Sequence, residues 1–131
     1  MIYFHIPFCK KRCLFCGCTA ELLPGKQDEL VRYFNALFAE MDEKLPWIDA
    51  SRPVTQVHFG GGTPSAVPYS FLEKILNKLR ERFTFAPHAE IAIECNPSLI
   101  DEPRLRELAQ MGFNRVSYGI QDFDPQVLKN V

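Results

Sequence analysis

The chain has 131 residues, 47% hydrophobic and 24% charged, a composition typical of one folded domain and not of a disordered segment. Its 15 basic and 16 acidic residues give a formal net charge of -1, so no bulk positive field favours a nucleic acid or an anionic membrane as partner. No apolar run approaches the roughly 18 residues of a membrane span and no signal-peptide pattern opens the chain, so we expect a cytoplasmic protein.

The first two predicted elements are a strand and a helix. Residues 2–6 form an apolar and aromatic run that Pro7 stops, which predicts a buried strand that opens into a loop. Between residues 28 and 45 apolar side chains recur at steps of three and four, which predicts an amphipathic helix. Its apolar stripe comprises Leu30, Val31, Phe34, Leu37, Phe38, Met41 and Leu45. Residues 46–53 form a connection, in which we expect Trp47 to pack rather than to contact a cofactor.

A second strand and helix follow. Residues 54–59 are rich in β-forming types and run into the glycine-rich turn 60–64, which predicts a strand ending in that turn. Ser70 lies three positions before Glu73, which predicts a capping box at the start of a helix. The apolar stripe of this helix comprises Leu72, Ile75, Leu76, Leu79 and Phe83.

The remaining sequence predicts two more strands and two more helices. Residues 90–95 and 115–120 are the third and fourth strands. Asp101 is a candidate cap of the third helix and Gly112 a good C-terminal stop. We expect the inner face of that helix to comprise Leu105, Leu108 and Ala109, with Pro103 tolerated in its first turn. A fourth helix is predicted to start at Asp124 and Pro125 and to continue toward Val131.

Strands that alternate with helices predict an α/β fold of right-handed βαβ units around a parallel sheet. A doubly wound sheet and a barrel both remain open on this pattern. Four units are too few to close an eight-unit barrel, which needs about 250 residues, and the fourth strand would present an edge able to pair. We therefore expect residues 1–131 to be the N-terminal part of a longer protein.

Four of the five cysteines lie within ten positions after the first strand. Thiolates are the usual ligands of iron-sulfur clusters and of structural zinc, and the spacing of Cys9, Cys13 and Cys16 lets them converge on one centre. Zinc sites usually collect paired ligands from two segments, whereas Cys95 is solitary, so we favour a cluster. Cys18 is either a fourth ligand or a neighbour, and we favour the neighbour.

Further polar groups follow the other strands. In parallel α/β folds the ligand lies beyond the carboxyl ends of the strands, where the glycine turn 60–64, Glu94 and Gln121 all fall. Three glycines let a ligand approach the backbone. A carboxylate within an apolar strand is paired with a buried base or awaits a ligand, and the position of Glu94 favours a ligand hydroxyl or amine. We assign no role to His5 or His58.

The pattern CxxxCxxC at Cys9, Cys13 and Cys16, followed by Gly-Gly-Gly-Thr-Pro at 60–64, resembles that of radical S-adenosylmethionine (SAM) enzymes. Within them, the chain is similar from end to end to the oxygen-independent coproporphyrinogen III oxidases of haem biosynthesis. The segments that carry this second resemblance are residues 3–9, 15–18, 112–115 and 119–123.

The resemblance implies that residues 1–131 form the first four strands of a partial TIM-like (β/α)6 radical SAM barrel, the N-terminal part of the catalytic domain. It also implies a 4Fe-4S cluster on Cys9, Cys13 and Cys16, whose free iron binds S-adenosylmethionine. Tyr3 and Gly61 would contact that S-adenosylmethionine, and Glu94 its ribose or amino acid portion. A second S-adenosylmethionine would lie against Phe15, Gly62, Thr63 and Gln121, with Cys18 near the cluster but not a ligand.

The implied activity is the oxidative decarboxylation of coproporphyrinogen III to protoporphyrinogen IX by a 5'-deoxyadenosyl radical. The implied partners are the tetrapyrrole substrate and a cytosolic electron donor, and the full-length protein would be a monomer. We expect the 131-residue piece alone to be inactive because it lacks the surfaces that close the site. Three alternatives remain, namely a related haem chaperone, a haem-modifying radical SAM protein and a zinc-binding structural module.

Overall fold

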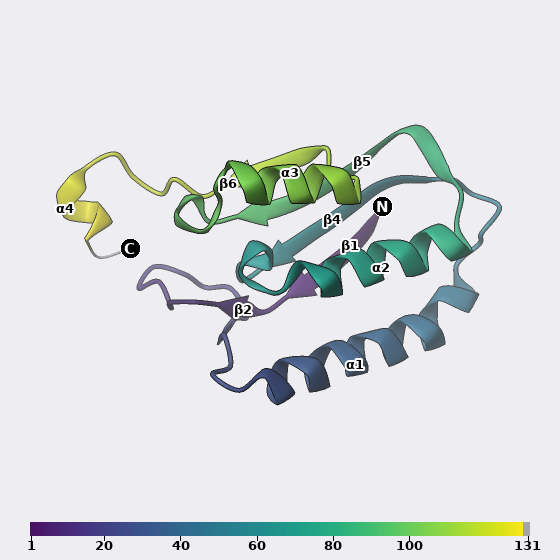
Figure 1. The fold of residues 1–131 in the computed structure, drawn as a ribbon, viewed down its shortest axis with the longest axis horizontal. Helices are drawn as coiled ribbons and strands as arrows, with labels where there is room; N and C mark the ends of the chain where they lie inside the picture. The colour runs from purple at the N-terminus through teal and green to yellow at the C-terminus, as the bar shows by residue number, and fades with distance from the viewer. Residues whose placement is uncertain (130–131) are drawn as a thin grey trace.

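Four parallel strands form the main sheet of the computed structural model, which describes residues 1–129 (Figure 1). The strands and helices, in chain order, are β1 (Ile2–Ile6), β2 (Phe8–Cys9), β3 (Glu21–Leu22), α1 (Gln27–Lys44), β4 (Val54–Gly61), α2 (Tyr69–Arg82), β5 (Phe85–Cys95), α3 (Glu102–Met111), β6 (Arg115–Tyr118) and α4 (Pro125–Leu128). Short 3-10 helices span Leu45–Trp47, Pro64–Ala66 and Pro97–Leu99. The four predicted strands and the first three helices are therefore confirmed, although β4 and β5 are longer than predicted and β6 ends at Tyr118, two residues before its predicted end.

The strand order is β1-β4-β5-β6, so each strand of the main sheet pairs with the main-sheet strand that precedes it in the chain. The register places Phe4 beside Phe59, Phe59 beside Ile93 and Ile93 beside Val116. A doubly wound sheet would reverse direction partway, whereas a barrel adds its strands in sequence. The order therefore favours the barrel, and it leaves β6 at an edge of the described sheet, as predicted.

The helices cover one face of this sheet. Side chains alternate along each strand, and Phe4, Ile6, Phe59 and Ile93 are buried with the apolar stripes of the helices in one core cluster. Figure 1 shows α2 between α1 and α3, and the rings of Phe34 in α1 and Phe71 in α2 stack with centroids 4.0 Å apart. The opposite face carries polar side chains that are only partly covered, and the site is built on this face.

Helix ends explain where α2 and α3 begin and stop. Asp101 accepts a hydrogen bond from the Arg104 backbone N–H over 3.0 Å, and Gly112 ends α3 in the left-handed conformation, with φ of 100°. Both expectations are confirmed. The capping box is wrong, because Pro68 is the N-cap of α2 and Ser70 already lies inside the first turn.

Three further expectations need correction or lie partly outside the structure. Trp47 is 87% exposed, because only Leu45 of its short 3-10 helix turns toward the core. Ala109 is also exposed, since α3 reaches the core through Leu108 and Met111. The fourth helix begins at Pro125 with Asp124 as its cap but ends at Leu128, with Lys129 as its C-cap, so it stops earlier than predicted; positions 130–131 of the prediction lie outside the described residues.

None of the helices in the described part of the chain combines the length and the apolar character that crossing a membrane would require.

Candidate cofactor site

The carboxyl ends of the four sheet strands point to the same side of the molecule, where the cysteine-rich loop also lies (Figure 1). The loops that follow β1, β4, β5 and β6 therefore meet at one edge of the sheet. This edge contains most of the residues that the sequence singled out.

The cysteine loop is tied at both ends by a small parallel sheet that the sequence did not predict. Phe8 and Cys9 of β2 pair with Glu21 and Leu22 of β3. The Leu23 backbone N–H also donates to the Cys9 carbonyl over 2.7 Å. These contacts close residues 10–20 into a loop that leaves the edge of the sheet and returns to it.

The four thiols of this segment, Cys9 at the end of β2 and three in the loop, are free and at least partly accessible. Cys9 and Cys13 are partly exposed, and Cys16 and Cys18 are exposed. The Cys16 backbone N–H donates to the Cys13 carbonyl over 3.3 Å, and the Cys18 backbone N–H donates to Cys16 Sγ over 3.4 Å. A hydrogen bond with Cys16, followed by the charge of the Cys16 thiolate, raises the pKa of Cys18.

Among residues 1–129, no three histidine, cysteine or acidic side chains are already gathered tightly enough to hold a metal ion. The donor set nevertheless fits an iron-sulfur cluster, because three free thiols come from one loop that is fixed at both ends. Assembly of a cluster would require those side chains to turn toward one point.

The glycine turn after β4 packs directly against the start of the cysteine loop. The Gly62 N–H donates to the Ile6 carbonyl and the Thr63 N–H to the Phe8 carbonyl, each over 2.8 Å. Thr63 Oγ1 donates to Cys9 Sγ over 3.6 Å. A Cβ on Gly62 would lie 2.8 Å from the Phe8 carbonyl oxygen and 2.9 Å from Cys9 Sγ, so only glycine permits this approach.

Glu94, at the end of β5, lies over the same turn. Its Oε2 accepts a hydrogen bond from the Gly61 backbone N–H over 3.2 Å. Gly61 itself has φ of 113°, a conformation that favours glycine. A Cβ on Gly60 would approach Glu94 Oε1 to 2.9 Å. The structure therefore brings Glu94, the glycine turn and Cys9 into one continuous surface.

Aromatic and histidine side chains flank Glu94 on the same face of the sheet. His58 Nε2 lies 3.0 Å from Glu94 Oε1, and the rings of Tyr3 and His58 stack at 5.7 Å with 14° between their planes. Partial burial raises the pKa of Tyr3, and the negative charges of Glu94 and Cys18 add to this effect.

His5 and His58 had no role in the sequence analysis, yet both lie in this site. His5 Nε2 donates to the Thr19 carbonyl over 2.8 Å, and its ring lies against Gly61. Tyr3, His5 and His58 lie on the face opposite the core, since side chains two apart in a strand share a face. The alternation of side chains along a strand could have placed these residues on one face from the sequence alone. The contacts of His58, however, depend on the register between strands.

Two of the expected site residues remain at the periphery. Phe15 is 57% exposed in the cysteine loop. Gln121 is exposed after β6, with an unusual positive φ of 69° for a residue other than glycine. The structure leaves both side chains in solvent and does not bring them against Glu94.

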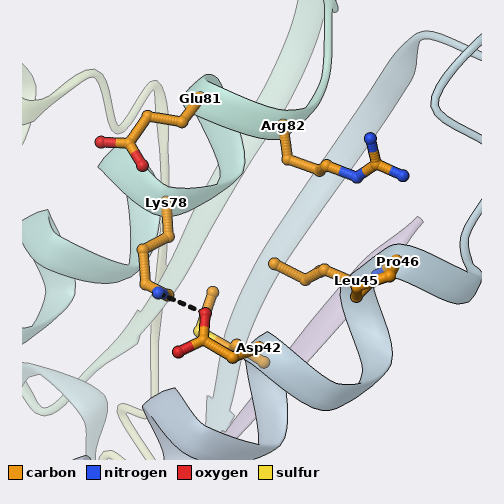
Figure 2. Close-up of a pocket in the computed structure, with 7 residues that line it drawn as sticks. Asp42, Leu45, Pro46, Lys78, Glu81 and Arg82 are labelled. Carbon is orange, nitrogen blue, oxygen red and sulfur yellow. Dashed lines mark hydrogen bonds and ion pairs between the residues drawn. The ribbon is translucent and has the colours of Figure 1, made fainter.

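A shallow pocket lies elsewhere, between the C-terminal ends of α1 and α2 (Figure 2). Lys78 of α2 and Asp42 of α1 form an ion pair across it over 2.6 Å. These helix ends and the cysteine loop lie at opposite ends of the molecule along the strand direction (Figure 1). The pocket is therefore separate from the candidate site.

Comparison with known proteins places this architecture in a family. The family model of the radical SAM superfamily matches residues 3–131. The chain belongs to that superfamily, whose members use a 4Fe-4S cluster and S-adenosylmethionine.

Similar proteins have names that are more specific. The chain is 42% identical over 130 residues to the oxygen-independent coproporphyrinogen III oxidase of Synechocystis, covering 99% of this chain. It is 41% identical over 130 residues to the enzyme of the same name from Escherichia coli, again covering 99% of this chain. The chain spans 28% of the length of each of these curated relatives.

A solved structure supports the fold. The coproporphyrinogen III oxidase of Escherichia coli, a radical SAM enzyme, matches with a TM-score of 0.88 and 41% identity. The match covers 98% of this chain and 29% of that protein. The expected fold class, parallel βαβ units of a radical SAM barrel, is confirmed.

Proposed function

We propose that this chain is the N-terminal part of the catalytic domain of a cytoplasmic enzyme that oxidises coproporphyrinogen III to protoporphyrinogen IX without oxygen. The single observation that supports this most strongly is the contact between the glycine turn and the cysteine loop through Thr63 and Cys9. It joins a three-thiol donor set to the glycine turn, over which the Glu94 carboxylate lies. The similarity to enzymes named for this substrate supports its assignment.

In this proposal Cys9, Cys13 and Cys16 hold the 4Fe-4S cluster, and Cys18 lies beside it without binding iron. The thiols are free, and the loop that carries them is anchored by β2 and β3. When bound, the cluster and S-adenosylmethionine supply the one-electron chemistry of the reaction. The chain itself contributes the ligands and their orientation.

Tyr3, Gly61 and Glu94 are the proposed contacts of the S-adenosylmethionine on the cluster. The Glu94 carboxylate lies near the carboxyl end of β5, and 43% of its side chain is exposed. Its unused lone pairs can therefore accept hydrogen bonds from ribose hydroxyls or an amine. Phe15, Gly62, Thr63 and Gln121 are the proposed contacts of a second S-adenosylmethionine. The exposed Phe15 ring is available to cover such a ligand.

The remaining parts of the proposal concern the longer protein. The rest of the barrel and a further domain would close the substrate pocket, so we expect residues 1–131 alone to be inactive. A cytosolic protein would donate the electron, and the full-length enzyme would act as a monomer.

The test uses the full-length protein, purified and reconstituted without oxygen. We expect bound iron and sulfide, and conversion of coproporphyrinogen III to the divinyl product. Cys9→Ser, Cys13→Ser and Cys16→Ser should each lose iron, whereas Cys18→Ser should retain it and serves as the matched control. Cleavage of S-adenosylmethionine with no vinyl product would disprove the substrate, and stoichiometric haem binding without decarboxylation would favour a haem chaperone. Zinc in place of iron and sulfide would disprove the cluster.

A further inference from the structure

We propose that His58 is a positioning residue for Glu94, holding that carboxylate in the orientation that receives S-adenosylmethionine. This inference rests on the proposed function, which assigns Glu94 to the ligand. In this role His58 would act through Glu94 and not through a contact of its own with the ligand.

Two separate groups hold the Glu94 carboxylate, one at each oxygen. Oε1 lies 3.0 Å from His58 Nε2, and Oε2 accepts from the Gly61 backbone N–H over 3.2 Å. An ionised carboxylate only accepts hydrogen bonds, so His58 donates from Nε2. Because each oxygen is held by a different group of β4, the His58 side chain and the Gly61 backbone, the plane of the carboxylate is fixed. Each oxygen retains a lone pair for a ligand hydroxyl or amine.

His58 is itself held in place from the neighbouring strand. Tyr3 is its register partner in β1, and the two rings are stacked nearly parallel. The His58 side chain is 23% exposed and that of Glu94 43%, so the histidine lies deeper on the face of the sheet. A partly buried, stacked imidazole is a rigid donor, whereas a mobile donor would have to be ordered when ligand binds.

Removing the His58 donor would leave the backbone N–H of Gly61 as the anchor that the structure provides for Glu94. The carboxylate could then rotate, and part of the binding free energy would be spent on ordering it. A hydrogen bond to a charged group contributes enough to change a dissociation constant by about 10-fold.

The chain offers a matched control two residues earlier on the same face of β4. Gln56 donates from Nε2 to Glu90 Oε1 over 2.7 Å, a cross-strand contact to a carboxylate of the same kind. It lies toward the amino ends of the strands, away from the glycine turn. Loss of the Gln56 contact should therefore leave the site unchanged.

The experiment measures S-adenosylmethionine binding by calorimetry to the full-length protein carrying its cluster, with iron content measured in parallel. His58→Phe keeps a ring against Tyr3 but removes the donor, and we expect binding about 10-fold weaker with unchanged iron. His58→Gln places an amide N–H near the position of Nε2 and should restore most of the affinity. His58→Asn carries its amide closer to the backbone and should not. Gln56→Leu should bind as the parent protein does.

The outcomes separate this inference from the proposed function. If Glu94→Ala binds S-adenosylmethionine normally, the ligand site itself is misassigned. If Glu94→Ala weakens binding and His58→Phe does not, the site stands and the role of His58 is wrong. The role is also wrong if His58→Asn restores binding as well as His58→Gln does, or if Gln56→Leu weakens it equally. Should His58→Phe fold poorly, the contrast between His58→Gln and His58→Asn decides.

Discussion

Thr63 donates a hydrogen bond from Oγ1 to Cys9 Sγ across 3.6 Å, which joins the glycine turn after β4 to the cysteine loop after β1. The two segments are far apart in the sequence, and the contact depends on the parallel pairing of β1 with β4. A hydroxyl that points at a proposed cluster ligand can also influence the electronic properties of the cluster.

Replacing Thr63 by valine should lower the reduction potential of the bound cluster. Hydrogen bonds to cluster sulfurs favour the reduced, more negatively charged state, and Thr63→Val removes one while keeping the side-chain shape. A redox titration followed by electron paramagnetic resonance would measure the change. Thr55→Val, at an exposed position of β4, is the control and should leave the potential unchanged. A potential that rises or stays constant in Thr63→Val would contradict this prediction.

Replacing Gly62 by alanine should prevent normal loading of iron. The new Cβ would lie 2.8 Å from the Phe8 carbonyl oxygen and 2.9 Å from Cys9 Sγ, so backbone must shift. Overpacking of this kind costs about 1–3 kcal/mol in the free energy of unfolding. Iron analysis and chemical denaturation measure the two effects. Gly17→Ala in the cysteine loop is the control, because nothing lies within 4 Å of its Cβ position.

Tyr69→Phe should stabilise the protein, and the gain should grow at alkaline pH. The Tyr69 hydroxyl is buried without a hydrogen-bond partner among the described residues, so its removal should gain about 1 kcal/mol at neutral pH. Burial raises the pKa of Tyr69 from its usual 10.0 to about 12, with the nearby Arg104 opposing the rise.

The sign of the pH effect follows from that pKa. The folded state holds the phenolic proton more tightly than the unfolded state, so the stability this provides is complete below pH 10.0 and is lost as the pH rises through about 12. Denaturant unfolding of both proteins across this window measures the difference. A constant difference between the parent protein and Tyr69→Phe would show that Tyr69 titrates normally.

Trp47 should behave as an exposed surface residue. It is the single tryptophan of the chain and is 87% exposed. Its fluorescence should be quenched by iodide almost as strongly as that of a free tryptophan derivative. Trp47→Ala should change the free energy of unfolding by less than about 0.5 kcal/mol, as surface substitutions usually do. Protection from iodide would indicate that another part of the protein covers this ring.

The cysteine loop shows which features of the site can be predicted from the spacing of residues and which cannot. The sequence predicted that Cys9, Cys13 and Cys16 share one loop after a first strand, because loop position and spacing are local properties. It did not predict that β2 and β3 would anchor the loop, since strands of two residues carry no periodic signal. The exposed Trp47 was missed for a related reason: hydrophobic character does not reveal which way a short turn faces the core.

Local sequence patterns determined the order of strands and helices, their apolar faces, the caps at Asp101 and Gly112, and the family motifs. Tertiary structure decided the barrel-like strand order and the partners of Glu94. The pairing of Phe59 with Ile93 sets His58 opposite Ala92, two positions from Glu94 along β5 and on the same face of the sheet, within reach of the Glu94 carboxylate. Periodicity tells which face of a strand a residue occupies, but register between strands that are distant in the sequence decides what it touches.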